Sequence, residues 1–425
     1  LCGICPVSHH LAASKALDQV VGAARVPPSA DKLRRLMHYG QVMQSHALHF
    51  FHLASPDLLF GFDADPARRH IVAVAEAHPD IARKGIALRK YGQEVIRATA
   101  GKRIHGTGSV PGGMNRHLSD ADHALLLADA ARMVEWAEDA VALVKRLHAA
   151  DPVRHERFGE VPAKMLSLVR PGDGALELYD GVVRVRDEDG RILLDDQDPC
   201  AYLDLIEEEV KPWSYMKFPY LRTLGPAYGW YRVGPLARVQ NCSVIDTPRA
   251  ERERREFLDA GHGRPIHAAL ATHWARMIEM LHAMEVIAAL LHDADLRHGP
   301  LTATGPRAGE GIGVIEAPRG TLIHHYRVGD DDLVTMCNLI VSTTHNNQAM
   351  NEAVRAVARE CFDGRALTEG LLNQIEVAIR AYDPCLSCAT HALGSMPLQL
   401  DLVGADGSRR GTLVRHGDGR FERED

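Results

Sequence analysis

Two pairs of cysteines, one near each end of the chain, constrain the fold more than any other feature. Cys2 and Cys5 form one Cys-x-x-Cys pair, and Cys385 and Cys388 form the other. Two intervening residues let both sulfurs of a pair point at one metal, and four thiolates suit zinc, iron or nickel. If the two pairs share a site, the two ends of this 425-residue chain must meet in the folded protein.

Three other interpretations of the cysteine pairs remain open at this point. A structural zinc site usually gathers its ligands from nearby sequence, so a zinc clip joining both chain ends is a minority solution. A thioredoxin-type dithiol needs a βαβ setting, whereas the apolar spacing after Cys5 predicts a helix. Chance pairing is disfavoured because His9 follows Cys5 by four residues and His391 follows Cys388 by three.

Composition and length indicate an ordinary globular protein. Hydrophobic residues make up 46% of the chain and charged residues 25%. The net charge of −7 argues against a nucleic-acid binder, and no apolar run is long enough to span a bilayer. The chain begins with Leu1, so we expect a further N-terminal segment in the natural protein. We expect the four remaining cysteines, which are scattered singly, to be buried structural thiols: Cys200, Cys242, Cys337 and Cys361.

Helical patterns dominate the chain. An apolar stripe from Trp274 to Leu291 predicts one long helix, with Pro265 in its first turn. A capping box at Ser119 predicts a second helix to about Val144, and residues 30–54 and 348–359 also have helical spacing. Residues 182–194 and 398–414 have the alternation and turn residues of β-hairpins. The prediction is a mainly α protein: one large helical domain around a long-helix bundle, with small β-hairpin insertions.

The cysteine motifs resemble those of a known family. Cys-Gly-Ile-Cys-x-x-x-His near the start and Asp-Pro-Cys-x-x-Cys-x-x-His near the end are similar, in order and separation, to the two signature motifs of NiFe-hydrogenase large subunits. The resemblance covers essentially the whole chain. It implies reversible oxidation of H2 at a nickel–iron centre whose iron carries CO and cyanide. Cys2 and Cys385 would bind nickel alone, and Cys5 and Cys388 would bridge nickel and iron.

Two internal segments extend the resemblance. Residues 316–320 resemble the family segment whose arginine hangs over the metals, which makes Arg319 the counterpart of that residue. A guanidinium has several N–H donors for an anionic cyanide, although a surface salt bridge is the ordinary alternative. Residues 341–346 resemble the segment whose hydroxyl holds the other cyanide, and Thr343 is the candidate. Many relatives have Pro at Ser342 and Trp at His345.

The resemblance also assigns roles around the metals. His9 would donate a hydrogen bond to a bridging sulfur, and Asp383 would lie near nickel, whereas Ser45 stands where some relatives have Asp. H2 would be split heterolytically, and its proton would pass to the Cys385 thiolate, with Arg319 as the rival acceptor. An onward proton-relay glutamate is expected in the missing N-terminal part.

His391 marks an expected processing site. In the family a peptidase cuts after this histidine once nickel has been inserted by accessory proteins, and the new C-terminus packs beside a magnesium site. Residues 1–391 would then be the large-subunit domain, and residues 392–425 would be a removable maturation peptide.

The resemblance implies partners as well. The chain has no further cysteine cluster for an iron–sulfur relay, so an iron–sulfur small subunit is expected to carry electrons away. The motif around Cys385 and residues 44–52 most resemble the cytoplasmic, bidirectional, NAD-reducing type, in which a diaphorase module holds FMN and NAD. The chain itself has no Rossmann glycine fingerprint.

Two alternative functions follow from the same motifs. A deazaflavin-reducing or other NiFe-hydrogenase is one. A non-catalytic scaffold is the other, either zinc-clipped or like the quinone-reductase subunit of the same fold, although those relatives lack the four cysteines.

Overall fold

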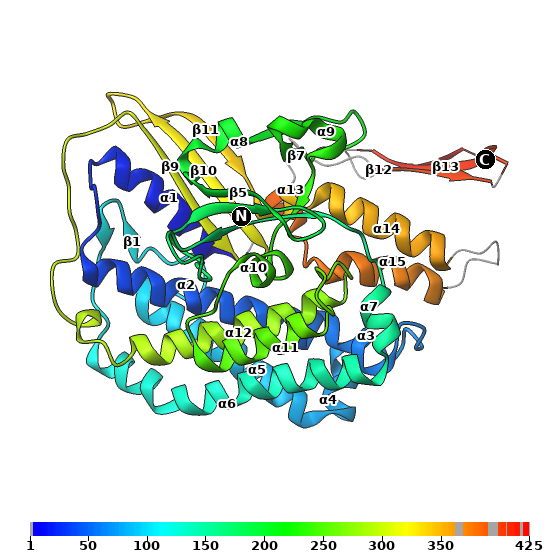
Figure 1. The fold of residues 1–425 in the computed structure, drawn as a ribbon, viewed down its shortest axis with the longest axis horizontal. Helices are drawn as coiled ribbons and strands as arrows, with labels where there is room; N and C mark the ends of the chain where they lie inside the picture. The colour runs from blue at the N-terminus through cyan, green and yellow to red at the C-terminus, as the bar shows by residue number, and fades with distance from the viewer. Residues whose placement is uncertain (1–2, 362–368, 390–397, 405, 417–419, 425) are drawn as a thin grey trace.

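The computed structural model describes residues 3–361, 369–389, 398–404, 406–416 and 420–424. Cys2 and His391 lie outside these residues, so their expected roles are not placed. Long helices form most of the molecule, and small sheets lie against one side of them (Figure 1). The predicted mainly α fold with small β insertions is confirmed.

The longer helices are α1 (Pro6–Val20), α2 (Pro28–Leu48), α5 (Pro79–Ala100), α6 (Asp120–Ala150), α11 (Pro248–Asp259), α12 (Ala271–Leu290), α14 (Asn347–Cys361) and α15 (Glu369–Ala381). The shorter ones are α3 (Ser55–Phe60), α4 (Ile71–Ala77), α7 (Pro152–Arg157), α8 (Tyr202–Leu205), α9 (Gly225–Tyr228), α10 (Pro235–Asn241), α13 (Ser342–His345) and α16 (Leu386–Ala389). A π-helical segment, η1 (His49–Ala54), continues α2.

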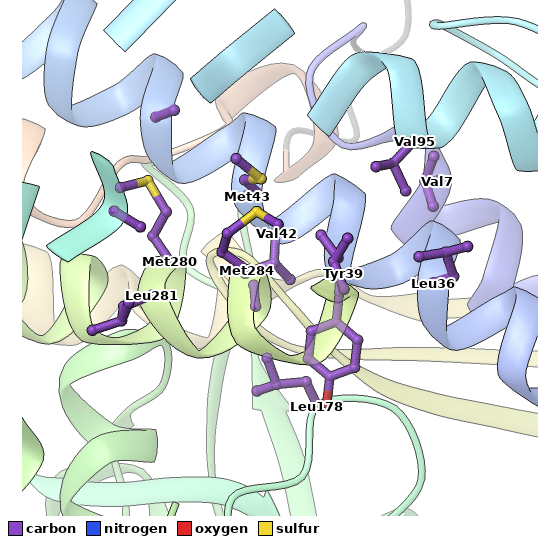
Figure 2. Close-up of a cluster of buried hydrophobic side chains, with 14 of the residues drawn as sticks. Val7, Leu36, Tyr39, Val42, Met43, Val95, Leu178, Met280, Leu281 and Met284 are labelled. Atoms are coloured by element: carbon purple, nitrogen blue, oxygen red, sulfur yellow. The ribbon is translucent and has the colours of Figure 1, made fainter. Parts of the chain in front are cut away.

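The core of the molecule lies between α2 and its neighbours α5 and α12, and α12 packs in turn on α6. Figure 2 shows Met43 of α2 against Met280 and Met284 of α12. The apolar stripe of α12 is buried along its length, as its spacing predicts. The methionines of this helix therefore fill the core.

Helix boundaries follow the local signals only in part. Ser119 accepts a hydrogen bond from the backbone N–H of Asp122 and caps α6, as predicted, although the helix continues to Ala150. The prediction that Pro265 opens the long helix is wrong, because α12 begins at Ala271. The backbone N–H of Ile266 donates to the Gln240 side chain and that of Ala269 to the Phe158 carbonyl. These tertiary hydrogen bonds replace the first helical turn.

A sheet that the sequence did not predict lies against α1. It is antiparallel and has the order β11-β10-β9, from β9 (Glu310–Ala317), β10 (Gly320–Val328) and β11 (Val334–Ile340). Gly320 pairs with Ala317, so Pro318 and Arg319 form the two-residue turn between β9 and β10. A Cβ at Gly313 would lie 2.0 Å from the Ala12 carbonyl oxygen, so α1 lies directly on β9.

The two predicted hairpins are confirmed, and each belongs to a larger sheet. β4 (Val182–Arg186) and β5 (Ile192–Gln197) join β3 (Lys164–Val169) and β8 (Tyr231–Arg232) in the order β5-β4-β3-β8. β12 (Leu398–Val403) and β13 (Arg409–Arg415) are extended by β14 (Phe421–Glu424) into a sheet that projects from the helical body in Figure 1. Two small sheets pair β1 (Ser109–Val110) with β2 (Gly113–Met114) and β6 (Ile206–Glu209) with β7 (Phe218–Leu221).

Within the described ranges, every helix is too short or too polar to cross a bilayer.

Candidate metal centre

Three thiols from opposite ends of the chain meet in the interior. Cys5 precedes the first turn of α1, and Cys385 and Cys388 belong to the turn that forms α16. The three sulfurs all lie within 4.8 Å of one another, and those of Cys385 and Cys388 are 3.1 Å apart. All three side chains are buried. The expected meeting of the chain ends is therefore confirmed for the described thiols.

Local backbone structure explains why each pair can converge. The N–H of Cys388 donates to the carbonyl of Cys385 at 3.2 Å, so one tight turn brings both sulfurs to the same side. Pro6 follows Cys5 and opens α1, where a missing N–H costs nothing. The N–H of Cys385 donates to Thr343 Oγ1 at 2.9 Å, which ties the second pair to α13.

Arg319 reaches the thiols from the turn between β9 and β10. Its Nε donates to the Asp383 carbonyl at 2.5 Å, and its Nη2 donates to Asp383 Oδ1 at 2.9 Å. Its Nη1 lies 3.5 Å from Ser45 Oγ. Burial would lower the pKa of Arg319, but the charges of Asp383, Cys5 and Cys385 together hold it above the usual range. Arg319 is thus a buried cation beside the thiols and not a surface salt bridge.

Asp383 accepts hydrogen bonds from Arg319 and lines a different cavity from the thiols. Its φ of 55° is in the left-handed region, and its Oδ2 is buried with no hydrogen-bond partner in the described part of the chain. Asp383 lines a cleft with His49, His52, Asp57 and Arg380. It is absent from the lining of the pocket that the thiols share, so it contacts that pocket through Arg319.

The pocket between the thiols is small and mostly apolar. Its walls are Cys5, His9, Ala317, Pro318, Arg319, Leu322, Val341, Ser342, Thr343, Cys385 and Cys388. Every residue predicted for the site whose side chain the structure describes, other than Asp383, lies in this wall. Thr343 and His9 therefore line the pocket together with Arg319.

A buried ion network holds the turn that carries Arg319. Arg238 of α10 donates to Glu279 of α12 at 2.6 and 2.7 Å and to Glu316 of β9 at 2.8 Å. It also donates to the carbonyls of Ala317 and Pro318, the two residues before Arg319. All three charged side chains are fully buried.

This network was not predicted from the sequence. Arg238 and Glu279 lie outside the motifs to which the sequence analysis gave a role. The available signal was a carboxylate between Ile278 and Met280 in a long and mostly apolar helix, because a buried charge needs a partner. Arg238 holds the pKa of Glu279 down at about 2, although burial alone would raise it.

The scattered cysteines differ from the expectation. Cys242 is buried, and burial raises the pKa of its thiol to about 11. Cys200 and Cys361 are only half-buried, and Cys337 on β11 is exposed. None of the four joins the metal-ligand group found among the described residues.

Comparison with known proteins gives consistent matches over most of the chain. A family profile described as nickel-dependent hydrogenase matches residues 1–78 and 185–391. The β subunit of the NAD-reducing hydrogenase HoxS from Cupriavidus necator is 46% identical over 424 residues, covering 96% of this chain and 86% of the relative. A vhu F420-non-reducing hydrogenase chain from Methanocaldococcus jannaschii is 42% identical over 363 residues, covering 85% of this chain and 86% of the relative.

Solved structures agree. A crystal structure of an NAD+-reducing [NiFe]-hydrogenase in the H2-reduced state has a TM-score of 0.90 and 58% identity, covering 92% of this chain and 86% of that one. A Ni-Fe-Se hydrogenase from D. vulgaris Hildenborough has a TM-score of 0.71 at 23% identity, with coverage of 92% and 88%. The second match supports the fold alone.

Proposed function

This chain belongs to the nickel-dependent hydrogenase family, and on that premise we propose that it is the catalytic subunit of an NAD-reducing enzyme that oxidises H2 reversibly. One observation carries the proposal: three buried thiols from both chain ends share a pocket with Arg319 and Thr343. The similarity to the HoxS β subunit over nearly the whole chain supports the NAD-linked type.

The described residues fit a nickel–iron centre. Sulfur ligands suit these metals, and three thiols within 4.8 Å of one another can share a pair of ions. We propose that Cys2 and Cys385 would hold nickel, and that Cys5 and Cys388 would be ligands shared by nickel and iron. Arg319 and Thr343 offer hydrogen-bond donors to cyanides on that iron, whose remaining ligand would be CO. When bound, the centre supplies the Lewis acidity and the electron sink that H2 cleavage needs.

The protein's own part is to exclude water and to move a proton. Ala317, Pro318, Leu322 and Val341 give the pocket an apolar wall, in which charged groups interact strongly. We propose that the Cys385 thiolate accepts the proton from H2. Arg319 is the weaker candidate because Asp383 keeps it charged, so that it has no lone pair to offer. Asp383, which is also a candidate catalytic residue, accepts two hydrogen bonds from Arg319 and would hold its guanidinium in place.

Electrons need a route out, and the described cysteines offer no second cluster along which to pass them. We propose that the immediate partner is an iron–sulfur small subunit, with a diaphorase module that holds FMN and NAD beyond it. The relative named as a HoxS subunit supports a complex of several chains. We place the complex in the cytoplasm, where NAD is available to such a module.

The C-terminal region supports a separate proposal about maturation. Strands β12, β13 and β14 pair only with one another in the described sheets, and their sheet extends away from the helices (Figure 1). We propose that a maturation peptidase removes residues 392–425 after nickel-insertion proteins have loaded the site. His391 would then help to hold a magnesium ion beside the new C-terminus.

A hydrogenase with another electron acceptor is the second candidate. The Methanocaldococcus relative, which is 42% identical, is named as F420-non-reducing and not as NAD-reducing. Reduction of NAD by H2 with the purified complex separates the two assignments.

Replacement of Cys385 tests the proposed role directly. We expect Cys385→Ser to lower H2-dependent dye reduction at least about a hundredfold, because a serine hydroxyl is a poor nickel ligand and a poor proton acceptor. Infrared spectra of the unsubstituted complex should contain CO and cyanide bands, and elemental analysis should find nickel and iron. The matched control is Cys361→Ser, a half-buried cysteine outside the site. Zinc without nickel, or full activity in Cys385→Ser, would refute the assignment.

A further inference from the structure

Hydrogen-bonded side chains lead from the thiol pocket to the sheet beside α1. His9 lines the pocket with Cys5, Cys385 and Cys388. Its Nδ1 lies 3.0 Å from Nε2 of His324 on β10, and Nδ1 of His324 lies 2.7 Å from the hydroxyl of Tyr326. His9 and His324 are buried. The direction in which these bonds donate decides which nitrogen of His9 carries its proton.

Tyr326 sets that direction. Its cross-strand neighbour is Cys337 on β11, and the two side chains are hydrogen bonded. Partial desolvation raises the pKa of the Cys337 thiol, and burial raises the pKa of Tyr326 to about 12, so both groups keep their protons at neutral pH. An imidazole nitrogen accepts a hydrogen bond far better than a thiol sulfur does. The Tyr326 O–H therefore donates to His324, and the weaker S–H donor serves the phenol oxygen.

His324 passes this direction on to His9. Burial, with a further contribution from His9, lowers the pKa of His324 to about 3, so its ring is neutral and has one N–H. With Nδ1 accepting from Tyr326, that N–H is on Nε2 and donates to Nδ1 of His9. His9 then carries its own proton on Nε2, the ring nitrogen that does not contact His324.

We propose that His324 and Tyr326 are positioning residues that fix His9 as its Nε2–H tautomer and so provide a hydrogen-bond donor to a metal-bound thiolate. The inference rests on the proposed nickel–iron site. If the bonds donated in the opposite direction, Nε2 of His9 would have a lone pair in place of its proton. That lone pair would repel the negatively charged thiolates. Outer hydrogen bonds of this kind tune the electron density that a ligand gives its metal.

The expected signature is spectroscopic. A hydrogen bond to a bridging thiolate withdraws electron density from the iron. When the bond is lost, the iron donates more density to its CO ligand, and the CO stretch moves to lower frequency. Activity alone would not separate this effect from a general loss of structure.

Infrared spectra of variants in the complete complex test the proposal. We expect His324→Leu to lower the CO frequency, because His9 then loses its hydrogen-bond donor. Tyr326→Phe should lower the frequency less, because His324 still forms a hydrogen bond with His9 but no longer has a partner that fixes its proton on Nε2. His324→Gln should restore the band, because a glutamine amide can donate from the position of Nε2. If His324→Leu does not assemble, the Tyr326→Phe and His324→Gln spectra decide the matter.

The control is a second pair of a tyrosine and a histidine, Tyr202 of α8 and His325 of β10, whose side chain leaves the strand on the opposite face from that of His324. Tyr202 is hydrogen bonded to Nδ1 of His325 at 2.9 Å, a bond of the same kind that does not lead to His9. Tyr202→Phe should leave the CO frequency unchanged. Equal shifts in Tyr202→Phe and Tyr326→Phe, or no shift in His324→Leu, would overturn the inference. Absence of CO and cyanide bands from the unsubstituted complex would instead refute the proposed function.

Discussion

At the scale of single residues, linear motifs predicted the groups that line the pocket, but not the groups that hold them. Cys5, Cys385 and Arg319 stand in short patterns that can be recognised along the chain. Glu279 and Arg238 act through a contact between two helices, and no local pattern encodes that contact. The same limit applies to the pairing of Arg319 with Asp383, which depends on how a turn meets the end of α15.

Asp383 offers a test of that pairing. Its φ of 55° suits Asn, whereas a residue without a short polar side chain pays about 1–2 kcal/mol there. Asn also keeps an oxygen that can accept from Arg319. We expect Asp383→Ala to lower the free energy of unfolding more than Asp383→Asn does, by about 2–3 kcal/mol, in thermal unfolding of the purified enzyme.

Asp332 supplies the matched comparison, because its φ is 61° and its ion pair with Arg307 is exposed. The difference in the free energy of unfolding between Asp332→Ala and Asp332→Asn should therefore reflect only the cost of placing alanine at a positive φ. Equal differences at the two positions would mean that the bond between Arg319 and Asp383 contributes nothing.

At the scale of elements, the long amphipathic helices were predictable and the sheet beside α1 was not. The apolar spacing of α12 and the capping box of α6 are local signals. Strand β9 has glycine at Gly311 and Gly313, which weakens any strand pattern. The glycines are explained only by α1, which lies too close for a side chain. This packing sets the distance between Cys5 at the start of α1 and Arg319 at the end of β9.

Gly313 therefore controls how closely α1 and β9 approach. A Cβ there would lie 2.0 Å from the Ala12 carbonyl oxygen, which is helix backbone and cannot rotate away. We expect Gly313→Ala to destabilise the protein by about 1–3 kcal/mol and to broaden the CO and cyanide bands as Cys5 shifts. Melting temperature and infrared spectra would measure the two effects. Gly309→Ala is the control, since its nearest neighbour would be 3.8 Å away; similar losses in both variants would contradict the explanation.

At the scale of the whole molecule, the interior holds many histidines that must stay neutral. Burial lowers the pKa of His38 and His345 to about 3 and that of His46 and His282 to about 4, from 6.5. Below pH 6.5 these histidines bind protons in the unfolded chain but stay neutral in the folded protein. The free energy of unfolding therefore falls as the pH falls toward 4. Composition alone gave 24 histidines and no means of knowing which are buried.

The variant His38→Gln measures how much one buried histidine contributes to the pH dependence of stability. Nε2 of His38 donates to the Leu178 carbonyl at 3.0 Å, and a glutamine amide can replace that bond. We expect the stability of the variant to depend less steeply on pH between 6 and 4, by about 1.4 kcal/mol per pH unit, in denaturant unfolding at fixed pH values. Exposed His292 is the control, and an unchanged slope in His38→Gln would show that His38 does not contribute.

The convergence of Cys5 with Cys385 and Cys388 also has a consequence for timing. Cys385 is synthesised 380 residues after Cys5, and Cys388 follows three residues later. Until Cys385 has been synthesised, Cys5 therefore has neither of these two partners with which to enclose a stray ion. Metal loading by all three thiols therefore has to wait until Cys388 has been synthesised.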